Sequence, residues 1–290
     1  MKEQKRVQSS QPRQPQEQEN KQAQSGELLT FGGHLEVFRQ MLFRVIAVAG
    51  ILAVVVFCLK DITWQLLLAP SEWDFCTYRW IEDVINWFMG LVDGSNAATP
   101  FHFEEYHVDL IATDLSSQFM THITTAVYLG LLGASPYILL ELFRFVSPAL
   151  YDNERRYSVV VTIIIYALFL LGVLMSYYVL FPISFRFLGT YSVAERIHST
   201  ITLDSYVTTF TTLTLIMGVV FQLPVIAFLL GKLGFVTSDM LSHYRRHAFL
   251  VIMLVAAVIT PPDLMTLILV TIPLYLLYEV SIRVVKIVEE

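Results

Sequence analysis

The chain has 290 residues, of which 55% are hydrophobic and only 15% are charged, and its mean hydropathy is +0.59. A soluble domain carries about 25% charged residues, so this composition excludes an ordinary soluble protein and indicates a chain that lipid solvates directly. The formal net charge of −6 excludes the basic field of a nucleic-acid-binding protein, and no nucleic-acid partner is expected.

The N-terminal segment, residues 1–29, is rich in Gln, Lys, Glu and Ser and almost lacks large apolar residues. Such a segment cannot bury enough apolar surface to fold, so we expect a disordered cytoplasmic tail over 1–29 and one membrane domain over 30–290. The first apolar run begins only near Phe43 and no small-residue cleavage site follows it, which differs from the pattern of a secretory signal peptide.

Six apolar segments follow the tail, and each is expected to form a membrane-spanning helix. They cover residues 43–59, 123–143, 157–181, 206–230, 248–259 and 264–278. Pro261 and Pro262 separate the last two, because consecutive prolines cannot continue a helix. Each of these two is then too short to cross a bilayer of normal thickness. The predicted fold is an all-α membrane protein with six transmembrane helices, the last two of them short.

Basic residues are unevenly distributed among the segments that connect these helices. If the N-terminus is cytoplasmic, fifteen of the 19 Lys and Arg residues lie on the cytoplasmic side, in the tail, in loops 144–156 and 231–247, and after the last helix. The positive-inside rule favours this orientation over its reverse. Six spans then return the C-terminus to the cytoplasm as well.

The first outer loop, residues 60–120, is long and acidic, and it contains Trp73, Trp80 and Trp87. We interpret this enlarged loop chiefly as an extracytoplasmic cap that packs on the span ends. The alternative is that residues 80–92 form an amphipathic helix lying at the membrane surface. A disulfide between Cys58, in the first span, and Cys76, in this loop, is not expected.

Gln222 is a polar residue inside the fourth apolar segment, just before Pro224. Its amide can hydrogen-bond a backbone group that Pro224 leaves without a partner, and a buried amide often does no more than join two helices. Polar groups at membrane depth also mark contact sites for partners. Both interpretations remain open from the sequence.

Enzyme signatures are missing from the sequence: there is no His-Glu-x-x-His zinc motif, no Gly-x-Ser-x-Gly elbow and no Gly-rich phosphate loop. We therefore expect a protein that is not an enzyme and needs no metal or other cofactor. The alternative is a secondary transporter for a small solute, which requires ionisable groups near the midplane. Segments 157–181 and 206–230 carry no charge, which argues against it. An intramembrane protease is a third class, and the missing motifs argue against that too.

The second and third spans are joined by a dense motif. Pro136 is followed by Phe145-x-x-Pro148-Ala149-Leu150-Tyr151 and then by Glu154-Arg155-Arg156. This pattern resembles the hallmark of the TatC family, the multi-spanning subunit of the twin-arginine, or Sec-independent, protein translocase. Further elements in the family's order are His34-Leu35-x-x-x-Arg39, Phe221-Gln222-x-Pro224, Thr260-Pro261-Pro262-Asp263 and Ile272-Pro273. The resemblance covers nearly the whole chain after the tail.

The resemblance implies a receptor for twin-arginine signal peptides and a core component of a translocase that exports folded proteins with the proton-motive force. It implies TatA/TatB-type single-span subunits as partners, a homo-oligomer within the complex, and the cell inner membrane, rather than the thylakoid membrane, as the location. The two guanidinium groups of a twin-arginine signal peptide need carboxylates as partners, because arginine binds a carboxylate through bidentate, charge-assisted hydrogen bonds. Glu154 is the first candidate for this role and Glu36 the second.

The implied site residues fall into three groups. Those expected at the signal-peptide site are Glu154, Glu36, Arg39, Phe145, Arg155 and Arg156, where the arginines keep the carboxylates ionised and oriented. Those expected to contact a partner at membrane depth are Gln222, Thr260 and Thr266. Those expected to shape the backbone are Pro136, Pro148, Tyr151, Pro224, Pro261, Pro262 and Asp263.

Overall fold

A computed structural model describes residues 31–93, 101–106, 108–146, 155–192, 194 and 200–289. The expected tail, residues 1–29, lies outside the described residues. The chain divides into two compact parts, one ending at Arg44 and a larger one from Val45 to Glu290. The first helix, α2 (Phe31–Cys58), runs through that division.

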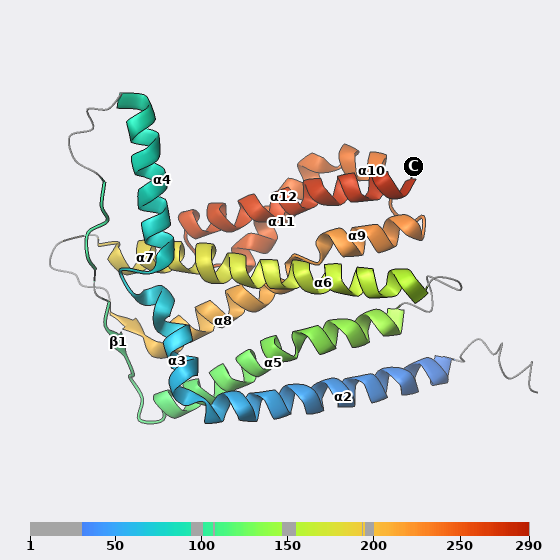
Figure 1. The fold of residues 1–290 in the computed structure, drawn as a ribbon, viewed down its shortest axis with the longest axis horizontal. Helices are drawn as coiled ribbons and strands as arrows, with labels where there is room; N and C mark the ends of the chain where they lie inside the picture. Colours follow the sequence, from blue (N-terminus) through green and yellow to red (C-terminus); the bar gives the residue numbers. More distant parts are fainter. Residues whose placement is uncertain are drawn as a thin grey trace, which may run out of the picture. The chain divides into compact units, whose positions relative to one another are not determined.

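Long apolar helices dominate the larger part and run side by side in it (Figure 1). They are α5 (Ser117–Val146), α6 (Arg155–Met175) with its continuation α7 (Phe181–Thr190), α8 (Leu203–Val220), α9 (Leu223–Lys232) and α12 (Leu264–Glu289). Among the described residues, five stretches are long and apolar enough to cross a membrane: Leu35–Cys58, Ser117–Phe145, Val161–Thr190, Leu203–Lys232 and Leu264–Glu289. Each covers all or most of one of the apolar segments expected from the sequence.

The fifth predicted span corresponds to α11 (Arg245–Ile259), which follows the short α10 (Ser238–His243). The 15 residues of α11 rise about 22 Å, less than the roughly 30 Å hydrocarbon core. This helix is therefore short, as expected, and a sixth crossing stays a prediction.

The prediction of a short last helix is wrong, because α12 has 26 residues and continues past Tyr278 to Glu289. The hydropathy falls after Tyr278, but the helix persists because its charged and apolar side chains both find partners. Glu279 pairs with Arg245 of α11, and Glu289 accepts hydrogen bonds from Ser238 of α10. Val285, which is fully buried, lies against the backbone of α9 at Gly231.

The described part of the first outer loop forms a cap on one end of the bundle, hereafter the cap end (Figure 1). The cap consists of α3 (Lys60–Leu68), a short 3-10 turn (Ala69–Ser71), α4 (Cys76–Asp93) and β1 (Leu110–Ile111). Strand β1 pairs in parallel with β2 (Ile201–Thr202), which precedes α8, with Leu110 opposite Ile201. The described residues of this loop thus pack on one end of the helices through α3 and β1, and the alternative of a helix at the membrane surface over residues 80–92 stays open.

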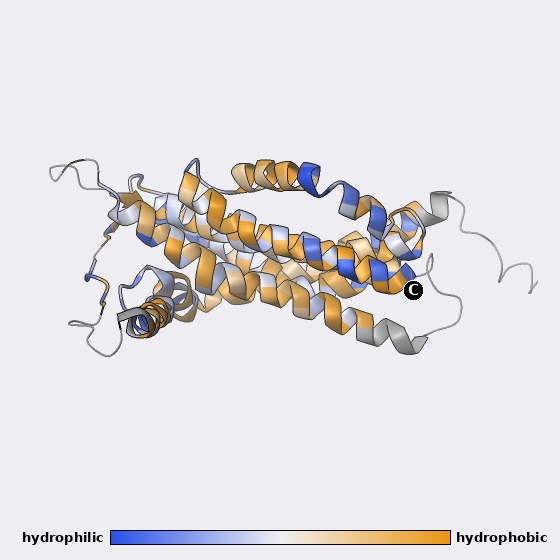
Figure 2. Ribbon diagram, turned by 90° about the horizontal axis from the view of Figure 1, so that it is seen from above, coloured by the Kyte–Doolittle hydropathy of each residue, from blue (hydrophilic) through white to orange (hydrophobic). Residues whose placement is uncertain are grey.

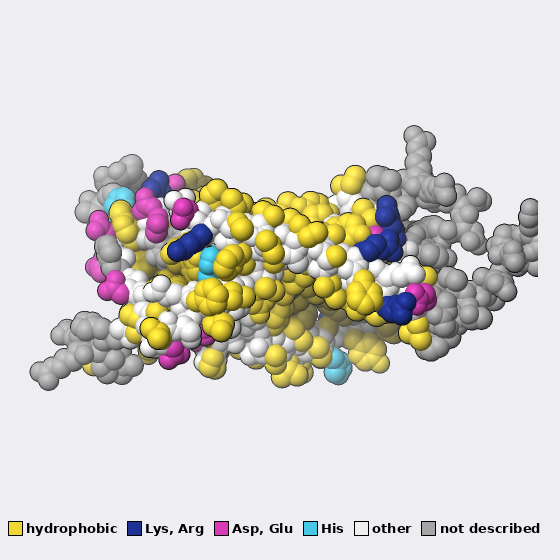
Figure 3. All heavy atoms as spheres, turned by 90° about the horizontal axis from the view of Figure 1, so that it is seen from below, with side chains coloured by type: hydrophobic (Ala, Val, Ile, Leu, Met, Phe, Trp, Pro, Cys, Tyr) yellow, Lys and Arg dark blue, Asp and Glu magenta, His cyan; other side chains and the backbone are white. Residues whose placement is uncertain are grey.

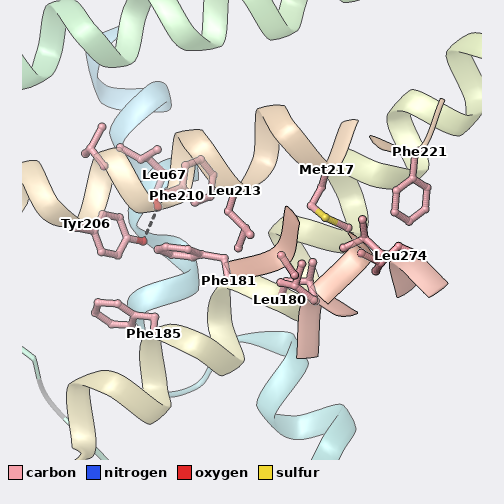
Figure 4. Close-up of a cluster of buried hydrophobic side chains, with 14 residues drawn as sticks. Leu67, Leu180, Phe181, Phe185, Tyr206, Phe210, Leu213, Met217, Phe221 and Leu274 are labelled. Atoms are coloured by element: carbon pink, nitrogen blue, oxygen red, sulfur yellow. Dashed lines mark hydrogen bonds between the residues drawn. The ribbon is translucent and has the colours of Figure 1, made fainter. Parts of the chain in front are cut away.

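Aromatic side chains join the cap to the bundle (Figure 4). Leu67 of α3 is 1% exposed, and its carbonyl accepts a hydrogen bond of 2.7 Å from the hydroxyl of Tyr206 on α8. The Phe181 ring stands nearly perpendicular to the rings of Tyr206 and Phe210, with centroids 5.1 and 5.0 Å apart. Such edge-to-face packing is favourable beyond its area, so the cap end contains the main hydrophobic core.

Glycines let neighbouring helices approach closely in the middle of the bundle. A Cβ at Gly172 of α6 would lie 2.6 Å from the carbonyl oxygen of Met217 on α8, and a Cβ at Gly218 of α8 would lie 2.7 Å from the Phe169 ring on α6. In lipid there is no hydrophobic driving force that brings helices together, so helix association depends on close packing, which small residues at the contact allow. The α6–α8 contact is therefore tight, and it positions the polar residues described next.

Candidate functional site

Gln222 lies at the break between α8 and α9, the two helices that together form the fourth apolar stretch. Pro224 stands in the first turn of α9, where a missing N–H is tolerated. Phe221 and Gln222 form the turn that joins the two helices, and the Gln222 carbonyl accepts hydrogen bonds from Val225 and Ile226. The proline thus ends one helix and begins another, and this break fixes the position of the Gln222 side chain.

The amide of Gln222 reaches across to the neighbouring helix α6. Its Nε2 donates a hydrogen bond of 3.0 Å to the carbonyl oxygen of Ile165, and the side chain is only 8% exposed. Its Oε1 is buried and has no hydrogen-bond partner among the described residues. Gln222 therefore joins two helices, as the structural interpretation expects, and also presents an acceptor that no described group uses.

A cavity of about 500 Å³ opens beside Gln222, between α5, α6 and the α8–α9 pair. Apart from Gln222 and Ser135, its lining side chains are apolar. They include Leu131, Ile138, Leu142, Phe169, Val219 and Leu229. A buried polar group without a partner costs roughly 1–3 kcal/mol, so a donor that reached Oε1 through a small movement of the Gln222 side chain would remove this cost.

The turn between α11 and α12 holds the other polar residues expected at membrane depth. Asp263 caps α12, because its Oδ1 accepts a hydrogen bond of 2.7 Å from the Thr266 backbone N–H. Thr266 is 1% exposed and Thr260 is 6% exposed, and the Thr260 hydroxyl donates to the Ala256 carbonyl. Both threonines thus face the interior of the bundle rather than its surface, and a direct contact with a partner stays a prediction.

The N-terminal part of the chain carries the second carboxylate candidate on the first helix. Arg39 Nη2 lies 2.6 Å from Glu36 Oε1, and Gln40 Nε2 donates to the same oxygen at 3.2 Å. The Glu36 side chain remains 48% exposed. Arg39 therefore pairs with Glu36 while the carboxylate stays accessible to a second cation, and a role of both residues in binding a signal peptide stays a prediction.

The motif between the second and third spans lies largely outside the described residues, including Pro148, Tyr151 and Glu154. The structure does describe Pro136 inside α5, the half-buried Phe145 in its last turn, and the backbone of Arg155 and Arg156 at the start of α6. The two helix ends lie at the end of the bundle opposite the cap (Figure 1). Phe145 and Arg155 therefore bracket the motif at that end.

Two acidic residues near the same end of the bundle were not among the site residues expected from the sequence. Glu141 of α5 is 6% exposed, and its Oε1 accepts a hydrogen bond of 3.0 Å from Tyr137, with Arg144 Nη1 at 4.0 Å. Glu279 of α12 receives two contacts from Arg245, of 3.0 and 3.1 Å, and a hydrogen bond from Tyr275. The available signal was the Tyr-x-x-x-Glu spacing, which places both side chains on one helix face.

Ionisable side chains separate along the bundle (Figure 3). On the face shown, acidic side chains gather at the cap end, basic ones gather at the opposite end, and a broad hydrophobic band lies between them. Within the described ranges, no group of three or more His, Cys, Asp or Glu side chains is placed to hold a metal ion. The polar features that remain are the Gln222 cavity and the charged end opposite the cap.

Comparison with known proteins gives a consistent result. A family model described as Sec-independent protein translocase protein (TatC) matches residues 33–273. The chain is similar to TatC of Blattabacterium sp. subsp. Periplaneta americana (strain BPLAN), with 29% identity over 88% of this chain and 94% of that protein. It is 40% identical to TatC of Halalkalibacterium halodurans over 59% of this chain and 67% of that protein. A crystal structure described as the twin-arginine translocase receptor TatC superposes with a TM-score of 0.68 and 26% identity, covering 89% of this chain and all of that one.

Proposed function

The chain belongs to the TatC family of Sec-independent protein translocase components, and from that premise we propose that it is the receptor for twin-arginine signal peptides in a translocase for folded proteins. The observation that carries this proposal is the family match over residues 33–273, which includes the whole Pro136 to Arg156 motif. The crystal structure of similar fold is itself described as a receptor.

The chemistry of the described residues supports this role. A twin-arginine signal presents two guanidinium groups, and each binds a carboxylate best through paired, charge-assisted hydrogen bonds. Glu36 is exposed and already oriented by Arg39. Glu154 follows the end of α5, beside the basic pair Arg155 and Arg156. We propose Glu154 as the main anchor, Glu36 as the second, and Phe145 as a further contact for the signal peptide.

A single-span partner of the TatA/TatB type is proposed to contact the chain at membrane depth. The unpaired Oε1 of Gln222, a residue that lines the apolar cavity, suits a helix that carries one polar side chain among apolar ones. The outward face of α11 offers a second contact, because Leu250, Leu254 and Val258 are all more than half exposed. The buried Thr260 and Thr266 would act there by holding the α11–α12 turn.

Energy for transport is proposed to come from the proton-motive force across the cell inner membrane. The sequence has no Gly-rich phosphate loop that would bind a nucleotide. Copies of the chain are proposed to assemble with one another inside the translocase complex.

The deciding experiment combines genetics with direct binding. Deleting the gene should cause twin-arginine precursors to accumulate in the cytoplasm, and the intact gene should restore their export. The purified chain in lipid nanodiscs should bind a fluorescent twin-arginine signal peptide and bind a twin-lysine peptide more weakly. Normal export in the deletion strain, or equal binding of both peptides, would reject the receptor role. A secondary transporter would instead leave precursor export intact and alter the uptake of a solute.

A further inference from the structure

Helix α4 in the cap has two chemically distinct faces. Its apolar positions Trp80, Val84, Trp87 and Leu91 recur at helical spacing and are between 46% and 68% exposed, and Phe88 beside them is 60% exposed. Acidic and amide residues occupy the other side. None of the described residues covers the apolar side of α4. A contiguous exposed apolar helix face of this kind marks a surface that lipid or another protein covers.

The polar face of α4 already has a partner within the chain. Glu82 Oε1 accepts a hydrogen bond of 2.6 Å from the Phe103 backbone N–H, and Asn86 exchanges hydrogen bonds of 3.0 and 2.6 Å with the Phe101 backbone. The hydrogen bond from Phe103 lowers the pKa of the Glu82 carboxyl below its ordinary value. The carboxylate therefore stays ionised at neutral pH, and the returning segment 101–103 covers the polar side.

The first turn of α4 fixes which way the helix faces. The Thr77 hydroxyl donates to the carbonyl of Tyr178, four residues before Pro182, whose ring nitrogen has no hydrogen to donate back. The Tyr78 hydroxyl donates to the Pro182 carbonyl at 2.8 Å. Both side chains therefore point from α4 toward the outer end of the third span.

Arg186 of α7 reinforces this attachment. Its guanidinium lies over the rings of Phe103 and Tyr106, at 4.3 and 4.6 Å from their centroids, and its Nη2 donates to the Glu104 carbonyl at 2.9 Å. Burial raises the pKa of the Tyr78 phenol, so its hydroxyl keeps the proton that it donates to Pro182. These contacts hold both the start of α4 and its returning segment on the span, and α4 projects as a fixed arm.

Helix periodicity extends this orientation along the arm. Residues three, four or seven positions apart share a face, so the half-buried Ile81 and Ile85 lie on the same side of α4 as Thr77 and Tyr78, and Phe88 lies next to them. That side is the side of the spans. Trp80 and Trp87 lie on a different, exposed side of the helix. Figure 1 shows α4 running across the direction of α5, α6 and α12, and Figure 2 views it end-on, so the two views agree.

We propose that α4 is an interfacial helix whose apolar face, formed by Trp80, Val84, Trp87, Phe88 and Leu91, lies in the outer leaflet of the bilayer around the bundle. Two observations select lipid as the occupant: the helix runs across the direction of the spans, and the Trp and Phe residues of its exposed apolar face suit the headgroup boundary. The polar face carries Glu82 and Asp83, so insertion depends on apolar burial and not on attraction to anionic lipid.

The test measures what surrounds each face of α4 in the full chain. Cys58 and Cys76 are both free and exposed, so both are first replaced by serine. An environment-sensitive fluorophore is then attached to Phe88→Cys on the apolar face or to Asp83→Cys on the polar face, and each protein is placed in lipid nanodiscs. Both positions are exposed, so neither substitution disturbs the bundle core. The fluorophore reports the local environment of each face and not export activity. The outcome is therefore independent of whether the receptor role is correct.

We expect the fluorophore at position 88 to show blue-shifted emission and strong quenching by brominated phospholipid, unchanged between neutral and anionic lipid. The fluorophore at position 83 should respond to aqueous iodide instead. Val84→Cys provides a second apolar position and should behave like position 88. Iodide quenching at 88 and 84 equal to that at 83 would overturn the proposal, because the face would then lie in water. Protection from both quenchers, with disulfide dimers or a cross-linked protein at 88, would overturn it in favour of a second copy or a protein partner.

Discussion

The side-chain amide of Gln222, at the α8–α9 break, has one atom in a hydrogen bond and one atom without a hydrogen-bond partner among the described residues. Gln222 Nε2 donates a hydrogen bond to Ile165, whereas Oε1 is buried without a hydrogen-bond partner among the described residues, and the residue lines an apolar cavity. Another polar pair at the same helix contact, Ser176 and Thr214, satisfies itself with a hydrogen bond of 3.1 Å. The contrast separates a group that only joins helices from one that can also bind a partner.

We therefore predict that Gln222→Leu reduces export although the protein remains inserted and abundant. The lost hydrogen bond to Ile165 should lower the free energy of unfolding by only about 0.6 kcal/mol, the average for such bonds in membranes. The control is Ser176→Ala, which removes an interhelical bond of similar strength at the same contact and should leave export unchanged. Normal export in the Leu variant would return Gln222 to a purely structural role.

Glu154 gives a second prediction at this scale. Glu154→Gln keeps the size of the side chain but removes its charge, so twin-arginine peptide binding should weaken by about 1.5–3 kcal/mol, or roughly ten- to a hundredfold. Peptide titration in nanodiscs measures the loss. Asp152→Asn, in the same loop, is the matched control and should bind normally.

Coupling then distinguishes a direct contact from a general defect. Replacing one peptide arginine by lysine should cost less in the Glu154→Gln protein than in the unchanged protein. Undiminished binding by Glu154→Gln would move the anchor to Glu36, which lies exposed beside Arg39.

How closely two helices approach depends on the positions of the glycines and not on their number. A Cβ atom added to Gly172 or to Gly218 would lie less than 3 Å from an atom of the opposite helix. A Cβ atom added to Gly50 of α2 would have no neighbour within 4 Å. The α6–α8 contact carries both the Ser176–Thr214 and the Gln222–Ile165 hydrogen bonds. Close approach at Gly172 therefore also positions the candidate site.

Gly172→Ala should separate α6 from α8, because the new methyl group would meet the backbone of Met217. Overpacking of this kind costs about 1–3 kcal/mol. Gly50→Ala should be neutral or stabilise the protein by up to about 1 kcal/mol, since it raises helix propensity in open space. Thermal unfolding in one detergent compares the two variants. Equal unfolding temperatures would show that the contact at Gly172 relaxes freely.

The α11 face leads to a prediction about the partner. A cysteine at Leu254, which is 67% exposed, should cross-link to a small single-span membrane protein in native membranes. A cysteine at Leu171 of α6, also exposed, is the control and should not. Cross-links from Leu171 alone would place the partner on the third span instead.

The molecule as a whole has chemically different ends. On the face shown in Figure 3 the cap end is acidic and the opposite end collects basic side chains, and the described basic residues include Lys232 at the end of α9 and Arg245 and Arg246 at the start of α11. The positive-inside rule then places the cap outside the cytoplasm. This charge separation agrees with the orientation expected from the sequence, which remains a prediction.

A membrane-impermeant thiol reagent on intact cells checks that orientation. Cys58 lies at the end of the first apolar stretch and is exposed on the surface of the protein, so it is replaced by serine first. Cys76, in the cap, should then react. With Cys76 also replaced, a cysteine at Asn153 should react only after the membrane is permeabilised. Labelling of that cysteine in intact cells would reverse the orientation.

Much of the fold followed from local pattern. Five long apolar stretches lie where hydropathy expects them, and the proline pair at Pro261 and Pro262 does separate two helices. The predicted end of α12 was wrong because hydropathy indicates only which residues can lie in lipid. Glu279 stays in the helix because it pairs with Arg245 on another element. The exposure of Thr260 and Thr266 was equally beyond local pattern, since it depends on which side of the turn packs inward.

The sequence by itself determined that this is an all-α membrane chain of the TatC family, because composition, hydropathy and a contiguous motif are local properties. Tertiary structure alone decided the state of Gln222, whose hydrogen-bond partner is 57 residues away in the chain. It alone decided that Thr77 and Tyr78 bond the third span, more than a hundred residues onward. Both outcomes depend on where distant backbone carbonyls come to lie, and only the packing of helices fixes that.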